Sequence, residues 1–263
     1  MKRAPQRGFT LVEMSIVLVI IGLILGAISI GKDVQRNAEY TKVKQKFIDQ
    51  WVLAYNTHTQ RTGVVPGDSQ TAPRLMVDGA NYAGSASQIS GGNMTGLSTP
   101  GVICHGTIGA GMTSTLEANL DLRTLMLQAG VRMPPGRAEG SEDRFVYLDT
   151  NGNPQEIQVC FQWNAPGTGS GAGNVMVISG LTPDLARSLD QMIDGKADAS
   201  EGLFRQADIM KTTHNLPGVQ WNTDNKQGFV DGGPTSGAAA VTSAVNMDEN
   251  QVTTVVAHYK MNQ

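Results

Sequence analysis

The N-terminal part of the chain contains its longest apolar run. Residues 14–31 are uncharged and mostly apolar, and Phe9 to Val12 extend the run on the other side of Glu13. A run of about 18 such residues is long enough to cross the hydrocarbon layer of a bilayer as a helix. We therefore expect a transmembrane helix over about residues 9–31.

After residue 31 the pattern becomes that of an amphipathic helix. Its apolar residues recur at spacings of three and four: Tyr40, Val43, Phe47, Trp51 and Ala54. This spacing places them on one face of a helix, with charged residues on the other faces. No proline occurs between Pro5 and Pro66 to interrupt it. The sequence therefore predicts one helix from Phe9 to about residue 60, whose second half docks on a globular head.

The rest of the chain predicts a head of mixed helices and strands. Gly63 to Asp68 breaks the first helix, and residues 79–111 are rich in Gly, Ser, Ala, Thr and Asn, which favours a long irregular region. Alternating or continuous apolar runs predict strands at 144–148, 156–163, 175–178 and 252–259. Residues 149–153 between the first two strands are typical of a hairpin turn.

Two further helices are expected in the head. Ser114 and Glu117 have the spacing of a capping box and predict a helix that ends at Gly130. Thr182 followed by proline predicts a second helix, closed by Gly195. The predicted fold class is α+β, with the long helix against an antiparallel sheet. The predicted regions are a leader at 1–8, the helix at 9–60 and the head at 61–263.

Charge separates the first eight residues from the rest. They contain Lys2, Arg3 and Arg7 and no acidic residue, in a chain with 20 basic and 23 acidic residues. Without them, 17 basic residues remain against 23 acidic ones. An acidic surface is repelled by phosphate backbones, so we expect no nucleic-acid binding.

The two cysteines, Cys104 and Cys160, are far apart in the sequence. Two thiols cannot form a closed zinc site alone, and neither belongs to a C-x-x-C pair. For a domain outside the cytoplasm a disulfide is the simplest interpretation. Two buried free thiols are the alternative.

Glu13 is the unusual residue of the apolar run. An ionised carboxylate is costly within the apolar layer, and such residues usually pair with another group. The alternative places Glu13 at the level of the head groups, in contact with water. An ordinary signal peptide fits poorly because the apolar part is too long, and a plain membrane anchor does not explain the glutamate.

The string Gly8-Phe9-Thr10-Leu11-Val12-Glu13, behind a basic leader and ahead of an apolar helix, resembles the processing motif of type IV pilins and type II secretion pseudopilins. The resemblance covers roughly the first sixty residues. It implies that a prepilin peptidase cuts between Gly8 and Phe9, that Phe9 becomes N-methylated, and that Glu13 serves in assembly. Four helical steps, about 6 Å, separate Phe9 from Glu13, so a neighbour shifted by this distance can place its amine on the carboxylate.

The resemblance also implies partners and a location. These are other pilin or pseudopilin subunits, the peptidase and an inner-membrane assembly platform, with one membrane pass in the bacterial inner membrane and the head in the periplasm. Lysine and arginine counts on either side of the apolar run do not favour this orientation, which comes from the resemblance alone. Gly22 and Gly26 form G-x-x-x-G, which permits close helix packing, although glycine is common in membrane helices.

No cofactor is expected, and calcium is the one metal with candidate ligands. Two loops carry oxygen donors: Asp149, Asn151 and Asn153, and then Asp224 and Asp231. The first loop departs from the EF-hand pattern because glycine comes fourth and proline sixth. A plain hairpin turn is the favoured interpretation.

Three classes of function compete. The favoured one is a structural subunit of a type IV pilus-like, type II secretion or DNA-uptake filament, and the large head predicts a minor subunit. The second is a binding module, in which a filament or membrane carries an adhesin or a cargo-recruiting head. The third, a membrane-anchored hydrolase, is disfavoured because the sequence shows no triad or metal-ligand spacing, so we expect no enzyme.

Overall fold

A computed structural model of the chain describes residues 10–82, 99–109, 111–112, 120–150, 152–209, 218–221, 226–230, 233–234 and 246–261. The chain divides into two compact units, residues 1–39 and Tyr40–Gln263. The second unit thus begins within the long helix, before the predicted head at residue 61.

The helical segment of the N-terminal region has three parts. The α-helix α1 spans Leu11–Val43, the π-helical turn η1 spans Lys44–Ile48 and the α-helix α2 spans Asp49–Thr62. The segment ends at Gly63, whose φ of 77° is in the left-handed region that glycine adopts readily. The long helix predicted from the sequence is therefore present. The π-helical turn within it was not predicted.

The predicted apolar stripe is the part of this segment that enters the core of the second unit. Phe47 and Trp51 are fully buried, and the Trp51 and Tyr55 rings lie 6.1 and 5.1 Å from the ring of Phe161. Trp51 Nε1 donates a hydrogen bond to the backbone oxygen of Glu142. Phe47 and Ile48, two consecutive residues of the π-helical turn η1, are both buried.

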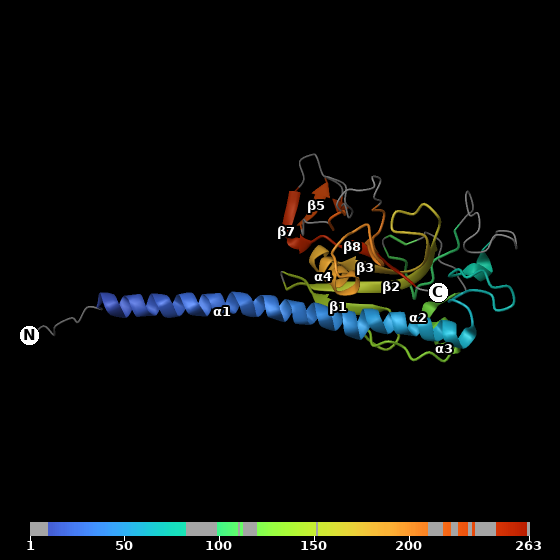
Figure 1. The fold of residues 1–263 in the computed structure, drawn as a ribbon, viewed down its shortest axis with the longest axis horizontal. Coiled ribbons are helices and arrows are strands. Elements are labelled where there is room, and N and C mark those ends of the chain that lie inside the picture. Colours follow the sequence, from blue (N-terminus) through green and yellow to red (C-terminus); the bar gives the residue numbers. More distant parts are fainter. Residues whose placement is uncertain are drawn as a thin grey trace, which may run out of the picture. The chain divides into compact units, whose positions relative to one another are not determined.

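The second unit is built on a five-stranded antiparallel sheet with the order β1-β2-β3-β8-β4. Figure 1 labels β1, β2, β3 and β8 of this sheet. The strands are β1 (Arg144–Leu148), β2 (Pro154–Asn164), β3 (Gly173–Leu181), β4 (Phe204–Gln206) and β8 (Val255–Lys260). Ile157, Val159 and Phe161 of β2 belong to the main core with α2. Their neighbours Gln158, Cys160 and Gln162 are buried too. The polar partners on β2 are thus covered by other parts of the head.

The remaining elements of the head are short. They are η2 (Gly79–Asn81), α3 (Leu122–Gln128), α4 (Pro183–Asp194) and a second sheet of β5 (Lys226–Val230), β6 (Gly233–Pro234) and β7 (Asn246–Val252). The backbone order in this sheet is β6-β5-β7. The α+β class and the antiparallel sheet predicted from the sequence are confirmed.

Two predicted elements need correction. Among the described residues of the helix expected over 114–130, Leu122–Gln128 are helical as α3, whereas residues 120 and 121 are not. The Asp121 side chain caps α3 by accepting a hydrogen bond from Thr124 N. The predicted cap at Ser114 and Glu117 lies outside the described residues. The last strand, expected over 252–259, begins at Val255, because Val252 pairs within the second sheet.

Candidate functional site

The first described residues form a helix cap around Glu13. Thr10 N and Thr10 Oγ1 donate hydrogen bonds to Glu13 Oε2 at 2.7 and 2.9 Å. In return, Glu13 N donates to Thr10 Oγ1 at 3.3 Å. This reciprocal pair is a capping box, and it explains why α1 begins at Leu11. The Thr-x-x-Glu spacing is readable in the sequence, but the prediction treated Glu13 only as a group for assembly.

The cap uses one oxygen of the carboxylate. Both bonds from Thr10 reach Oε2, and Oε1 accepts no hydrogen bond among the described residues. A carboxylate offers about four acceptor positions, so Glu13 can hold the cap and accept from a second donor at the same time.

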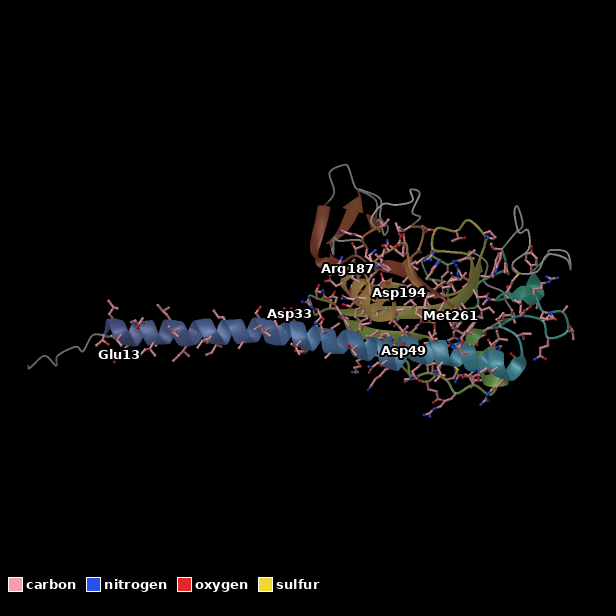
Figure 2. All side chains as sticks on the ribbon, viewed as in Figure 1. Glu13, Asp33, Asp49, Arg187, Asp194 and Met261 are labelled. Carbon is pink, nitrogen blue, oxygen red and sulfur yellow. A yellow bond between two sulfur atoms is a disulfide. The ribbon has the colours of Figure 1, made fainter. Side chains whose placement is uncertain are left out.

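The helix that follows Glu13 is apolar and exposed in the single chain. Glu13 is the one charged residue between Thr10 and Gly31, and Figure 2 shows it at the start of α1, with Asp33 farther along the same helix. The exposed large apolar residues are Leu11, Val12, Met14, Ile16, Val17, Leu18, Val19, Ile20, Ile21, Leu23, Ile24, Leu25, Ile28, Ile30 and Val34. By length and composition this helical segment can cross a membrane.

The two glycines of the G-x-x-x-G pattern lie on α1. Apart from the adjoining residues and the backbone of the helix itself, no described atom lies within 4 Å of the position that a Cβ would take at Gly22 or Gly26. Because they are four residues apart, they lie on one face of the helix and leave a shallow surface there. Within the single chain this surface is free for a helix from another molecule.

Comparison with known proteins decides how this segment is interpreted. Residues 3–29 match the family model described as the prokaryotic N-terminal methylation motif. This match supports a relationship of the N-terminus to the type IV pilin and pseudopilin family. The match spans Gly8, Phe9 and Glu13, of which Gly8 and Phe9 lie outside the described residues. No curated protein and no solved structure was found to match the chain.

The prepilin-type motif carries coarse functional information. Its family is structural rather than enzymatic, and the motif implies assembly with other pilin subunits and processing by a prepilin peptidase. Together with the apolar helix it indicates a membrane-anchored filament subunit.

In the head, Cys104 and Cys160 form a disulfide with their Cα atoms 4.6 Å apart. Ile103 and Phe161, next to these cysteines, exchange backbone hydrogen bonds of 2.8 and 3.0 Å. The bond therefore attaches the segment around residue 103 to the central strand β2.

The calcium candidates do not come together as a metal site in the described part of the head. Asp149 Oδ1 accepts from Asn153 N, and Asp149 Oδ2 accepts from Gln155 Nε2, as expected of a hairpin turn. Asn151, Asp224 and Asp231 lie outside the described residues. Among the described residues, no group of three or more His, Cys, Asp or Glu side chains is arranged to hold a metal ion.

A histidine–aspartate pair in the head is structural. His105 Nδ1 lies 2.5 Å from Asp121 Oδ1, and His105 Nε2 lies 3.0 Å from the backbone oxygen of Gly140. The hydrogen bond with Asp121 raises the pKa of His105. Since both ring nitrogens already have partners, neither is available to activate a nucleophile.

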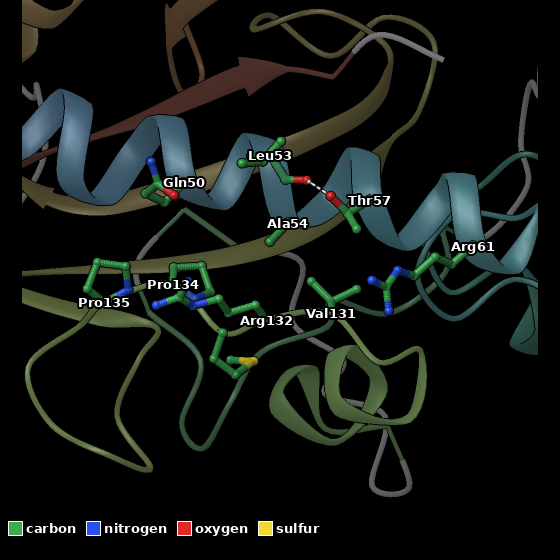
Figure 3. Close-up of a pocket in the computed structure, with 10 residues that line it drawn as sticks. Gln50, Leu53, Ala54, Thr57, Arg61, Val131, Arg132, Pro134 and Pro135 are labelled. Atoms are coloured by element: carbon green, nitrogen blue, oxygen red, sulfur yellow. Dashed lines mark hydrogen bonds between the residues drawn. The ribbon is translucent and has the colours of Figure 1, made fainter.

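The head also has an open cavity of about 650 Å³ between α2 and residues 131–135 (Figure 3). Leu53, more than half exposed, forms part of one wall, and Pro134 and Pro135 form part of the other. Arg61 donates to the backbone oxygen of Gly130 at 2.5 Å across one end. Sequence reasoning did not find this cavity, because it needs the packing of two distant segments.

Proposed function

We propose that this protein is a subunit, and by the size of its head a minor one, of a type IV pilus-like or type II secretion filament. After cleavage between Gly8 and Phe9, its N-terminal helix packs with the helices of other subunits. The observation that carries this proposal is the lone carboxylate of Glu13 at the start of an exposed apolar helix, within the matched motif.

The geometry at Glu13 supports a specific pairing. In the proposed filament, the amine of a neighbour's N-methylated Phe9 donates to Glu13 Oε1 while Thr10 keeps its two bonds to Oε2. The pairing neutralises a charge in an apolar surrounding and sets the axial position of the neighbour. The cap and the assembly contact are then simultaneous rather than competing uses of one side chain.

The disulfide supports a periplasmic head, because disulfides persist in oxidising compartments. We therefore place the leader on the cytoplasmic side and the head in the periplasm.

Three variants separate charge from capping. Glu13→Gln keeps an oxygen that accepts from Thr10 but carries no charge, and glutamine serves in capping boxes. Thr10→Ala loses the side-chain part of the cap and keeps the charge. Glu13→Ala loses both. We expect all three to be processed at Gly8, with incorporation into filaments retained by Thr10→Ala and lost in the other two.

The measurement is the amount of each variant in sheared filaments relative to the membrane fraction. Normal incorporation of Glu13→Gln would refute the charge pairing. Loss of incorporation in Thr10→Ala together with normal incorporation of Glu13→Gln would show that the cap is what matters.

The second candidate, a binding module, is favoured by the cavity beside α2. A head fragment for testing it must begin at Tyr40, because cutting at residue 61 removes the buried Phe47, Trp51 and Tyr55. Surface or cargo binding by this fragment, lost in Leu53→Asp, would support the module.

A further inference from the structure

The end of α4 holds an aspartate with no access to solvent. Asp190 is fully buried, and its Oδ2 accepts hydrogen bonds of 2.6 Å from Trp221 Nε1 and from Asp198 N. Its other oxygen, Oδ1, is also buried and has no donor in the part of the chain that the structure describes. A buried carboxylate oxygen without a donor is costly, so this atom requires an explanation.

The group within hydrogen-bonding reach of Asp190 is a second carboxyl, that of Asp194 one helical turn later. Asp194 Oδ2 accepts from Leu203 N and Phe204 N, both at 2.9 Å. Its place at the end of α4 is shown in Figure 2. Two acceptors that face each other, one of them fully buried, repel unless a positive charge lies between them.

We propose that Asp190 and Asp194 share one proton. While this proton is bound, the two carboxyls hold residues 198–204 and 218–221 against the end of α4. We call this arrangement the latch; it is closed when these residues contact α4 and open when they do not. The shared proton supplies the donor that Asp190 Oδ1 lacks. It also leaves the two Oδ2 atoms free to accept the four hydrogen bonds described above.

The contacts around the pair show what the latch holds. Asp198 Oδ1 accepts from Val219 N, and Ala199 N donates to the backbone oxygen of Val219. The ring of Trp221, almost fully buried, lies 5.5 Å from the ring of Phe204 of β4 and is tilted against it. Residues 198–204 and 218–221 thus reach α4 through the two carboxyls.

Among the described residues, no nearby cation takes the place of the proton. Lys196 Nζ is 3.2 Å from Asp198 Oδ2 and 3.8 Å from Glu201, and it is largely exposed. On β8, the Tyr259 hydroxyl is neutral, because burial raises its pKa. Burial, with the repulsion from Asp194 added to it, likewise raises the pKa of Asp190 to about 7.

The raised pKa of Asp190 determines how the stability of the latch changes with pH. A carboxyl whose pKa is raised in the closed state binds its proton more tightly there than in an opened state, where its pKa is about 4. The latch is therefore most stable at acidic pH, and its stability falls as pH rises from about 4 to about 7. With one proton released on opening, the opening constant rises about tenfold per pH unit in this range.

Hydrogen exchange of the full chain in detergent tests the inference. Exchange rates of peptides that cover 198–204 and 218–221 are corrected for the intrinsic effect of pH and converted to opening constants. For the natural chain we expect a rise of about 50-fold between about pH 5 and about pH 7, because the tenfold slope levels off at the raised pKa. Peptides from residues 14–31 of α1, which belong to the other compact unit, serve as a reference and lack this rise.

Two variants replace the shared proton by an amide donor. In Asp190→Asn the amide donates to Asp194 and its oxygen accepts from Trp221. In Asp194→Asn the amide donates to Asp190. Each is expected to keep the segments closed and to make the opening constant independent of pH. The matched control Asp184→Asn, on the first turn of α4, keeps the tenfold slope.

The proton itself is visible in infrared spectra of the natural chain. We expect the carbonyl stretch of a protonated carboxyl at about pH 6, lost in either asparagine variant. Absence of this band, absence of the slope in the natural chain, or a slope that persists in both asparagine variants would overturn the inference. A slope that disappears when calcium is added would also overturn it, in favour of a metal ion.

Discussion

We predict that loss of the disulfide lowers the unfolding free energy of the head. The size of the decrease depends on the number of residues between the two cysteines. Cys104 and Cys160 are 56 positions apart, and closing a loop of this length in the unfolded chain corresponds to about 4 kcal/mol of unfolding free energy. For a domain of this size, 1 kcal/mol changes the melting temperature by about 2–4 °C. We therefore expect Cys104→Ala with Cys160→Ala to lower the melting temperature by about 10 °C.

The single variants make the test specific. Cys104→Ala and Cys160→Ala each break the same bond, so each alone should lower the melting temperature nearly as much as both together. Thermal unfolding of the full chain in detergent, followed by circular dichroism, measures all four proteins. The cross-link argument is refuted if the decreases in melting temperature of the two single variants add up in the double variant. It is also refuted if the unfolding free energy of the double variant is within about 1 kcal/mol of that of the natural protein.

The oxidation state of Cys104 and Cys160 in the cell tests on which side of the membrane the head lies. A head in the periplasm should yield protein in which both cysteines resist alkylation until a reductant is added. Free thiols in freshly extracted protein would argue against a periplasmic head.

Two further predictions concern the head. Trp51→Ala should destabilise it by about 3–5 kcal/mol, since the ring is fully buried against Phe161, and chemical denaturation would measure this. The pKa of His105 is raised by Asp121, so the stability from this pair is complete below about pH 6.5 and is lost as pH rises through the raised pKa. His105→Gln should flatten this part of the pH profile, whereas His258→Gln, at a histidine whose pKa is lowered by burial, should leave it in place.

The sequence predicted those elements whose signals are local. Thr182 accepts a hydrogen bond from Leu185 N and Gly195 has a φ of 79°, so both ends of α4 coincide with the expected residues. The hairpin after β1 was likewise predicted from its five turn residues, and the Asp149 side chain accepts a hydrogen bond within the turn.

What the sequence did not predict depends on long-range contacts. The strand β4 has three residues, too few for any periodic pattern, and it exists because it pairs with β8 some fifty residues later. The contact between Trp221 and Asp190 was not predicted, since the two residues are 31 positions apart. The capping box of Thr10 and Glu13 has a local sequence signal, but the prediction gave the carboxylate only a role in assembly.

The central claim is that this chain becomes a filament subunit through a new amine at Phe9, placed to meet the carboxylate of Glu13. Intact mass spectrometry of the protein extracted from membranes tests it most directly. The account predicts a chain that starts at Phe9 and carries one added methyl group. A chain that still begins with Met1, Lys2 and Arg3 would contradict it, because the amine would then lie eight residues from its proposed position.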